Sequence, residues 1–291
     1  MTADADAQVR LTVEGRVARA SIDRPPLNLL DKSLLSQFEA AFGDAETKAD
    51  VLLVESAVPG FFAAHYDLEE LLAEDVTSLR TSMGDFNRLM ERIRTSRLVT
   101  IAKVRGAARG GGCELLLAFD MRFASRQLAV FSQPEAVLGI IAAGGGTQRL
   151  PDFVGRARAL EMLLAGDDID ADIAERYGLV NRALPDQLLD GFVDALLDRL
   201  ASVPATALGM AKLAVDAAVG RWSAGYALEA LELDSLRRDE ATRERMQQFL
   251  DQGGQSRAAE LDFQRTIGLA FSESIPYCGE RRGLTEGEEP K

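Results

Sequence analysis

Two glutamates, Glu114 and Glu135, stand beside glycine-rich segments in the middle of the chain. Glu114 ends the segment GAARGGGCE at 106–114, and the apolar run LLLAF follows it directly. Glu135 ends FSQPE at 131–135 and precedes a second glycine-rich segment, GGGTQRL, at 144–150. Two neighbouring carboxyl groups can share a proton, so that one activates water as a base while the other donates as an acid. The segment 106–135 is therefore predicted to build a catalytic cleft around this pair.

The glycine triplet at 110–112 allows the backbone to approach a ligand closely. If the apolar run after Glu114 is a buried helix, the free N–H groups at its start can stabilise an oxyanion. The triplet is not a nucleotide-binding loop, because neither GxxxxGK[ST] nor GxGxxG occurs. Other interpretations stay open at this stage. Close helix packing also explains three glycines, Glu114 could simply complement a helix dipole, and Glu135 could be a solvated loop charge.

The rest of the composition narrows the chemistry. His65 is the only histidine, so a His-rich metal site is excluded and any Ser-His-Asp or Cys-His site would have to use this residue. The two cysteines, Cys113 and Cys278, form neither a disulfide framework nor a CxxC metal motif. The 46 acidic residues exceed the 33 basic ones and give a net charge of −13, which disfavours nucleic-acid binding. Proton chemistry is thus expected to rest on carboxylates, with no metal.

The chain of 291 residues is long enough for one large domain, or one domain with an appendage. Its N-terminus, MTADADAQVR, resembles neither a signal peptide nor a transit peptide. No apolar run approaches the roughly 20 residues that span a bilayer. We expect a cytoplasmic protein without a membrane segment.

Strands and helices alternate over the first part of the chain, which favours an α/β layered domain. Apolar patterns predict strands at 9–13, 17–22, 51–54 and 99–104, with a hairpin turn at Glu14-Gly15. Asp31 is expected to cap a helix, and Asp67, with Glu70 three residues later, has the spacing of a capping box.

After residue 155 the pattern becomes largely helical. Helices are predicted at 158–164 and 171–177, each followed by a glycine, and a third is expected before Pro204. Longer helices are predicted at about 205–218 and 223–250. We therefore divide the chain into a core at 1–200 that holds the active site, a C-terminal helical region at 201–270, and a flexible tail at 271–291.

Several motifs together resemble the crotonase superfamily, the group of enoyl-CoA hydratases and isomerases. They are GGGCE, QPE and GGGTQRL, followed by LLAGDDIDADIAERYGLVNRALP at 163–185. The resemblance covers roughly residues 9–250 and is densest from 100 to 185. It implies a spiral of ββα turns whose C-terminal helices assemble homotrimers or dimers of trimers. It also implies an acyl-CoA substrate, with CoA carried on the substrate and no separate cofactor.

The resemblance also assigns roles to residues. Two backbone N–H groups, of Tyr66 and Gly111, would form the oxyanion hole for the thioester carbonyl. Glu114 and Glu135 match the two glutamates that hold the added water in hydratases. The segments around them would contribute the substrate-binding residues Ala64, His65, Asp67, Arg109 and Gly110. Family isomerases usually lack the equivalent of Glu114, so the presence of both glutamates favours hydration of a 2-enoyl thioester.

One segment departs from the family pattern. FFAAHYD at 61–67 carries His65-Tyr66 where the family normally has Gly-Ala. Both side chains could point away from an ordinary hydratase site, or they could reshape the pocket for an unusual acyl group or a substrate without CoA. Arg109 could pair with a substrate carboxylate or phosphate, or lie on the surface. Isomerisation, or hydrolysis of a carbon–carbon bond in a β-diketone, is the alternative activity.

Overall fold

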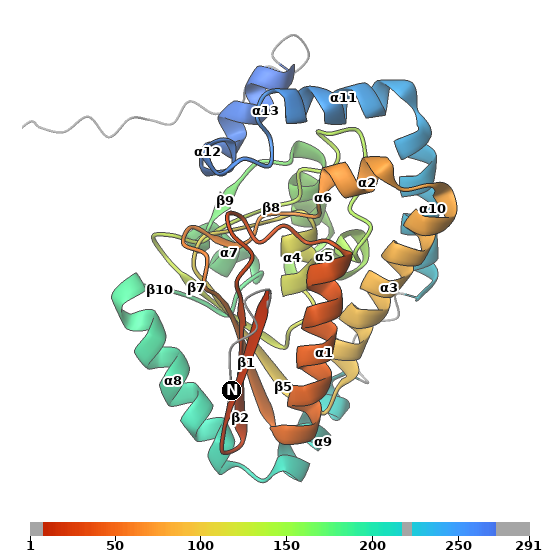
Figure 1. Ribbon diagram of the computed structural model, residues 1–291. Coiled ribbons are helices and arrows are strands. Elements are labelled where there is room, and N and C mark those ends of the chain that lie inside the picture. The colour runs from red at the N-terminus through yellow and green to blue at the C-terminus, as the bar shows by residue number, and fades with distance from the viewer. Residues whose placement is uncertain (1–7, 217–222, 272–291) are drawn as a thin grey trace, which may run out of the picture.

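The computed structural model describes residues 8–216 and 223–271 of the protein. A six-stranded sheet with the order β1-β2-β3-β5-β7-β10 forms its centre (Figure 1). These strands are Val9–Glu14, Val17–Ile22, Val51–Ser56, Val99–Val104, Met121–Ser125 and Arg182–Leu184. β1 and β2 form the predicted antiparallel hairpin, and all other pairs in this sheet are parallel.

A second, four-stranded sheet has the order β4-β6-β8-β9. Its strands are Phe61–Ala63, Ala107–Arg109, Val130–Ser132 and Ile169–Asp170, of which only β9 is antiparallel to its neighbour. Successive strands alternate between the two sheets, because β3, β5 and β7 enter the first sheet and β4, β6 and β8 enter the second. Each turn of the chain therefore adds one strand to each sheet, which confirms the predicted spiral of the α/β class.

Helices cover both faces of the large sheet. α1 (Lys32–Lys48) and α3 (Val76–Thr95) lie on one side, and α8 (Asp186–Ser202) lies on the other (Figure 1). Leucines and valines of α8 pack on β3, β5 and β7, while phenylalanines of α1 pack on the opposite face. Asp31 caps α1 as predicted, because its side chain accepts a hydrogen bond from the Leu34 N–H at 2.7 Å. The strands of a parallel sheet buried on both faces read as continuous apolar runs, as β3 does.

Shorter helices follow the strands of the second sheet. They are α2 (Leu68–Ala73), α4 (Gly111–Leu116), α5 (Gly146–Val154), α6 (Arg156–Ala165) and α7 (Ala171–Tyr177). The Asp67 cap of α2 is confirmed, since its carboxylate accepts from Glu69 and Glu70. The expected helix over the apolar run after Glu114 is wrong in position: α4 begins at Gly111 and ends at Leu116. Glycines without side chains let this short helix lie directly against β4, which an apolar pattern alone does not reveal.

The C-terminal part consists of α9 (Ala205–Asp216), α10 (Ser223–Arg238), α11 (Glu240–Asp251), α12 (Arg257–Leu261) and α13 (Phe263–Phe271). The single helix predicted at 223–250 is divided, because Asp239 accepts from the Thr242 N–H and starts α11. α10, α11 and α13 pack with α2, α3 and the loop at 137–143 in one apolar cluster. The division of the chain at residue 200 stays a prediction, and the predicted tail at 271–291 lies almost entirely outside the described residues.

Candidate active site

An apolar cavity of about 50 Å³ lies between the ends of β4, β6 and β8 and the C-terminal helices. His65, Tyr66, Gly111, Glu114 and Glu135 line its polar part. Tyr66 follows β4, Gly111 follows β6 and Glu135 follows β8, so three neighbouring parallel strands deliver these groups to one place. The remaining wall is apolar, and Leu71, Met83, Ile140, Leu233, Phe249 and Phe263 belong to it.

Two backbone N–H groups are left available at this cavity. The Leu30 N–H donates to the His65 carbonyl at 2.8 Å, and the Asp67 N–H donates to the Leu30 carbonyl at 2.8 Å. These two hydrogen bonds occupy the His65 carbonyl and the Asp67 N–H, but the Tyr66 N–H between them has no acceptor in the described part of the chain. The Gly111 N–H, at the start of α4, likewise has no acceptor there. A Cβ added at Gly111 would lie 3.3 Å from the Tyr66 nitrogen, so the two donors are adjacent and can serve one oxygen atom.

Glu114 is buried, with 3% of its surface exposed, and its Oε1 accepts hydrogen bonds from the Gly144 and Gly146 N–H groups at 2.8 Å each. The second glycine-rich segment is therefore the support of the first glutamate. Gly144 and Gly146 cannot carry side chains here, because an added Cβ would lie 2.6 Å from Glu114 Oε2 and 2.9 Å from Glu114 Oε1, respectively. Arg149 contributes to the same support by donating to the Gly144 carbonyl at 3.2 Å.

Glu135 is also buried rather than a solvated loop charge, with 9% exposure. The amide of Gln133, oriented with its nitrogen toward this carboxylate, donates to Oε1 and Oε2 at 3.2 and 3.1 Å. Burial raises the pKa of Glu135 to about 7; the charge of Glu229 also raises it, and that of His65 opposes the rise. Burial, followed by the charges of Glu135 and Glu229, raises the pKa of Glu114 well above its usual range. Two buried carboxyl groups at one cavity disfavour simultaneous ionisation, so the pair is suited to hold one proton between them.

A third buried carboxylate, Glu229 of α10, holds the other N–H groups of the glycine loop. It accepts from the Gly145 N–H at 3.0 Å, the Thr147 N–H at 3.1 Å and the Thr147 hydroxyl at 2.5 Å. Burial raises the pKa of Glu229 to about 7. Two carboxylates from different helices thus bind the loop at alternating residues. No local pattern in the sequence indicates this role, because Glu229 occupies an ordinary position in an amphipathic helix.

His65 and Tyr66 both line the cavity, which favours the alternative in which they shape the pocket over the one in which both side chains point away. The Tyr66 ring lies 6.4 Å from that of Phe86, and burial, with the nearby charge of Glu70, raises the pKa of the phenol. Among the described residues, Asn28 and Gln255 are the only ones other than glycine with positive φ, so His65 carries no strain of that kind. The His65 ring contacts Glu260 of α12, a residue that the sequence did not single out.

Arg109 neither lies on the surface nor points into the cavity. It is 4% exposed and forms two hydrogen bonds with Asp168, at 2.8 and 2.7 Å. Its guanidinium also covers the Phe263 ring, with 4.4 Å to the ring centre. The structure therefore differs from both alternatives for Arg109, pairing with a substrate carboxylate or phosphate and a place on the surface, because Asp168 already binds this charge. Ala64, Asp67 and Gly110 adjoin the cavity residues in sequence but are not part of its wall, and their roles in substrate binding stay predictions.

Within the described ranges, no cluster of His, Cys, Asp and Glu side chains is arranged to hold a metal ion. Nor does any helix there have the length and apolarity needed to cross a membrane. The site brings together two N–H donors and two buried carboxyl groups. Such a site belongs to the class of enzymes that stabilise an enolate-like oxyanion next to an acid/base pair.

Comparison with known proteins places the chain within that class. The family model for enoyl-CoA hydratase/isomerase matches residues 12–256. A relative from Rhizobium meliloti, named "Probable enoyl-CoA hydratase", is 38% identical over 207 residues, which cover 70% of this chain and 79% of the relative. A Bacillus subtilis relative of the same name is 33% identical over 84% of this chain and 95% of its own. The chain belongs to the enoyl-CoA hydratase/isomerase family.

Solved structures agree with the fold. The crystal structure of a candidate enoyl-CoA hydratase from Streptomyces avermitilis matches with a TM-score of 0.82 at 35% identity, covering 92% of this chain and 98% of that one. An enoyl-CoA hydratase from Mycobacterium avium subsp. paratuberculosis matches with a TM-score of 0.75 at 27% identity, covering 84% and 96%. The protein is an enzyme with the crotonase fold, and the resemblance predicted from GGGCE and QPE is confirmed.

Proposed function

We propose that the protein hydrates a 2-enoyl-CoA to the corresponding 3-hydroxyacyl-CoA. One observation carries this proposal: the free N–H groups of Tyr66 and Gly111 and the carboxyl groups of Glu114 and Glu135 face the same apolar cavity. The relatives named as enoyl-CoA hydratases support the same substrate class.

The geometry accounts for each step of a hydration. The thioester oxygen accepts from the Tyr66 and Gly111 N–H groups, which stabilise the negative charge that develops as water attacks C3. The ionised carboxylate of the pair takes a proton from that water, and the protonated carboxyl gives its proton to C2. Hydroxide is thus added at C3 and a proton at C2, with no net change in the protonation of the pair. A single oxyanion donor of this kind contributes about 3–4 kcal/mol to the barrier reduction.

The cavity wall also indicates the acyl class. Apart from the polar groups above, the space is bounded by aliphatic and aromatic side chains, which favour an unbranched or small apolar acyl group over a charged one. No lysine or arginine lines it, and His65, the one basic side chain in its wall, is already paired with Glu260, so a second carboxylate on the substrate has no free partner there. We therefore propose a short, apolar 2-enoyl thioester as the substrate.

The proposals for cofactor, oligomeric state and location in the cell are made by analogy with the family. We propose that CoA enters only as part of the substrate, without a separate cofactor or metal, and that the chain forms a homotrimer or a dimer of trimers in the cytoplasm. Exposed apolar side chains of α9, such as Met210 and Val215, support a subunit contact on that helix.

The test is loss of the conjugated enoyl-thioester absorbance when crotonyl-CoA is mixed with the protein. Glu114→Gln keeps the shape of the side chain but cannot exchange a proton, and we expect hydration to fall by about 10²–10⁴-fold. Glu244→Gln, an exposed change on α11, is the matched control. If Glu114→Gln still hydrates crotonyl-CoA, the two-carboxylate mechanism is wrong. If the wild type instead converts a 3-enoyl-CoA into the conjugated 2-enoyl isomer, the activity is that of an isomerase, and the hydratase proposal fails.

A further inference from the structure

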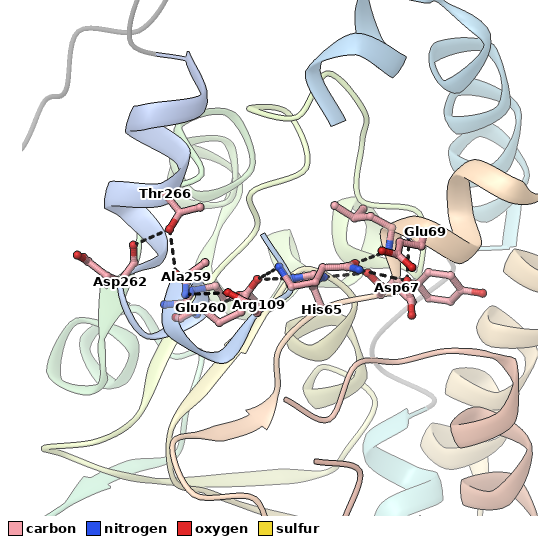
Figure 2. A network of polar contacts seen from close by, with 12 residues as sticks. His65, Asp67, Glu69, Arg109, Ala259, Glu260, Asp262 and Thr266 are labelled. Carbon is pink, nitrogen blue, oxygen red and sulfur yellow. Dashed lines mark hydrogen bonds and ion pairs between the residues drawn. The ribbon is translucent and has the colours of Figure 1, made fainter. Parts of the chain in front are cut away.

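The side chain of His65, the only histidine of the chain, is enclosed between the active-site cavity and the C-terminal helices. Its Nε2 lies 3.0 Å from Glu260 Oε1, and its Nδ1 lies 2.8 Å from the Tyr66 carbonyl oxygen. The rings of Phe249 and Phe263 close the space around it, each with its centre 6.4 Å from that of the imidazole. Figure 2 shows His65, Arg109 and Glu260 together, with Glu260 reaching the core from α12.

Both partners of the imidazole are acceptors. The Tyr66 carbonyl has no proton to give, and neither has Glu260 when ionised. A neutral imidazole has only one N–H and would leave a lone pair facing a second acceptor. The charged form has two N–H groups and satisfies both partners. The geometry therefore selects the imidazolium.

The surroundings support this charge. Burial lowers the pKa of His65, but the carboxylate of Glu260 and the two hydrogen bonds raise it above the ordinary value. Glu260 is 1% exposed, and burial would raise its pKa, yet the charge of His65 keeps it below the usual range. Its Oε1 accepts a further hydrogen bond from the Gln255 N–H at 2.9 Å. Arg109, whose guanidinium lies 4.0 Å from Glu260 Oε2, opposes the charge on His65 but is itself paired with Asp168.

The side chain of His65 also starts close to Glu135, and its charge acts on that carboxyl group. His65 and Glu135 meet at Gly110, where an added Cβ would lie 3.4 Å from His65 Cβ and 2.9 Å from Glu135 Oε1. The other charged groups that face Glu135 are Glu114 and Glu229, both acidic, so His65 supplies the opposing charge. On its other side, the Nδ1–H of His65 fixes the carbonyl of Tyr66, while Leu30 fixes the carbonyl of His65. Both peptides around the Tyr66 N–H are thereby held.

We propose that His65, held as an imidazolium by Glu260, is a positioning residue that orients the Tyr66 N–H and keeps Glu135 ionised. This inference rests on the proposed hydratase function only for its effect on turnover. Through Glu260, the short helix α12 becomes part of the catalytic machinery although none of its side chains lines the cavity. The replacement of the small residues common in the family by His65-Tyr66 thus has a structural counterpart. His65 forms an ion pair with Glu260, which lies 195 residues later in the chain.

The charge state can be measured without any assay of activity. Because the chain contains one histidine, selective ¹⁵N labelling of histidine in the untagged protein yields a single imidazole whose signals need no assignment. We expect both ring nitrogens to carry protons at pH 7.5 in the wild type. In Glu260→Gln the ring should become neutral at that pH. A neutral imidazole in the wild type at pH 7.5 overturns the proposal.

The effect on the reaction is read from the pH dependence of kcat/KM for crotonyl-CoA. Loss of the positive charge near Glu135 should move the acidic limb of the profile to higher pH by about one unit in Glu260→Gln. His65→Gln should shift the limb in the same direction and also lower kcat at the pH optimum, with little change in KM. Glu244→Gln, exposed on α11, is the control and should reproduce the wild-type profile. An unshifted limb in both variants refutes the positioning role.

The two measurements separate this inference from the proposed function. If the wild type does not hydrate crotonyl-CoA but its imidazole is doubly protonated, the hydratase proposal fails and the ion pair stands. If hydration is observed and the imidazole is neutral, the function stands and the ion pair fails. A variant that does not fold leaves the wild-type NMR result decisive.

Discussion

Replacement of Glu229 by glutamine changes how the stability of the protein depends on pH. Glu229 is 1% exposed, lies behind the loop at 144–147 and accepts three hydrogen bonds from it. Burial raises its pKa to about 7 from the ordinary value of 4.5. Glutamine keeps the size of the side chain and removes the titration.

The magnitude follows from linkage between protonation and folding. Between pH 4.5 and 7 the folded protein keeps the proton of Glu229, whereas the unfolded chain has released it. Its contribution to stability is therefore complete below the unfolded pKa and is lost as pH rises through the folded pKa. A pKa raised from 4.5 to about 7 corresponds to about 3 kcal/mol of stability. The stability of Glu229→Gln relative to wild type should increase by about 2–3 kcal/mol from pH 5 to pH 8.

The assay is urea unfolding at constant ionic strength and protein concentration, at pH 5, 6, 7 and 8, for wild type, Glu229→Gln and the exposed control Glu244→Gln. The free energy of unfolding of the control should depend on pH in the same way as that of wild type. Because folded Glu229 keeps its proton up to about pH 7, the same substitution should leave the acidic limb of kcat/KM nearly unchanged, unlike Glu260→Gln. If the difference in free energy of unfolding between Glu229→Gln and wild type changes by less than about 0.5 kcal/mol from pH 5 to pH 8, the reasoning is refuted.

Two further substitutions test the walls of the site. Gly112→Ala places a methyl group over the Ala63 carbonyl, 2.9 Å from the Ala63 Cβ, and should separate α4 from β4. Displacement of the Gly111 N–H should lower kcat by about 10²–10³-fold. The control Gly84→Ala, at a helical position with open space, should leave kcat unchanged. Equal kcat values for Gly112→Ala and wild type would contradict a backbone oxyanion donor at Gly111. Phe263→Ala should cost about 3–5 kcal/mol of stability and extend the cavity, so that 2-enoyl-CoA substrates with longer chains gain in kcat/KM relative to crotonyl-CoA. A chain-length profile identical to that of wild type would show that Phe263 does not bound the acyl group.

Much of the architecture could be predicted from the sequence because local signals decide it. The apolar run of β3, the Asp31 cap and the glycines after α6 and α7 determine their own structures. The pairing of Glu114 with Glu135 was also predictable, since an unusual carboxylate stands next to each glycine-rich segment. These features need only neighbours in the chain.

Contacts between distant segments were not predictable in this way. Glu229 and Glu260 are separated from their partners at 145–147 and 65 by about 80 and 195 residues, respectively. Neither carries a local pattern that distinguishes it from a solvent-facing glutamate on a helix. The burial of Arg109 was not predictable for the same reason, because its partner Asp168 lies 59 residues away. A buried charge is evident in a sequence only when its partner is close along the chain.

The order β4-β6-β8 of the small sheet has a consequence for how such a site can change. The Tyr66 N–H, the Gly111 N–H and Glu135 each follow one of these adjacent parallel strands, so their lateral separation is set in steps of the strand spacing, about 4.8 Å. The sheet thereby fixes the spacing of the reacting groups. A residue exchanged at the end of one strand changes the group there without moving the groups at the other two strand ends. A strand lost or inserted would shift a whole catalytic group by a full step, farther than any hydrogen bond can reach. Activities in this architecture can therefore diverge by substitution at the ends of β4, β6 and β8, but not by gain or loss of a turn of the chain between these strands.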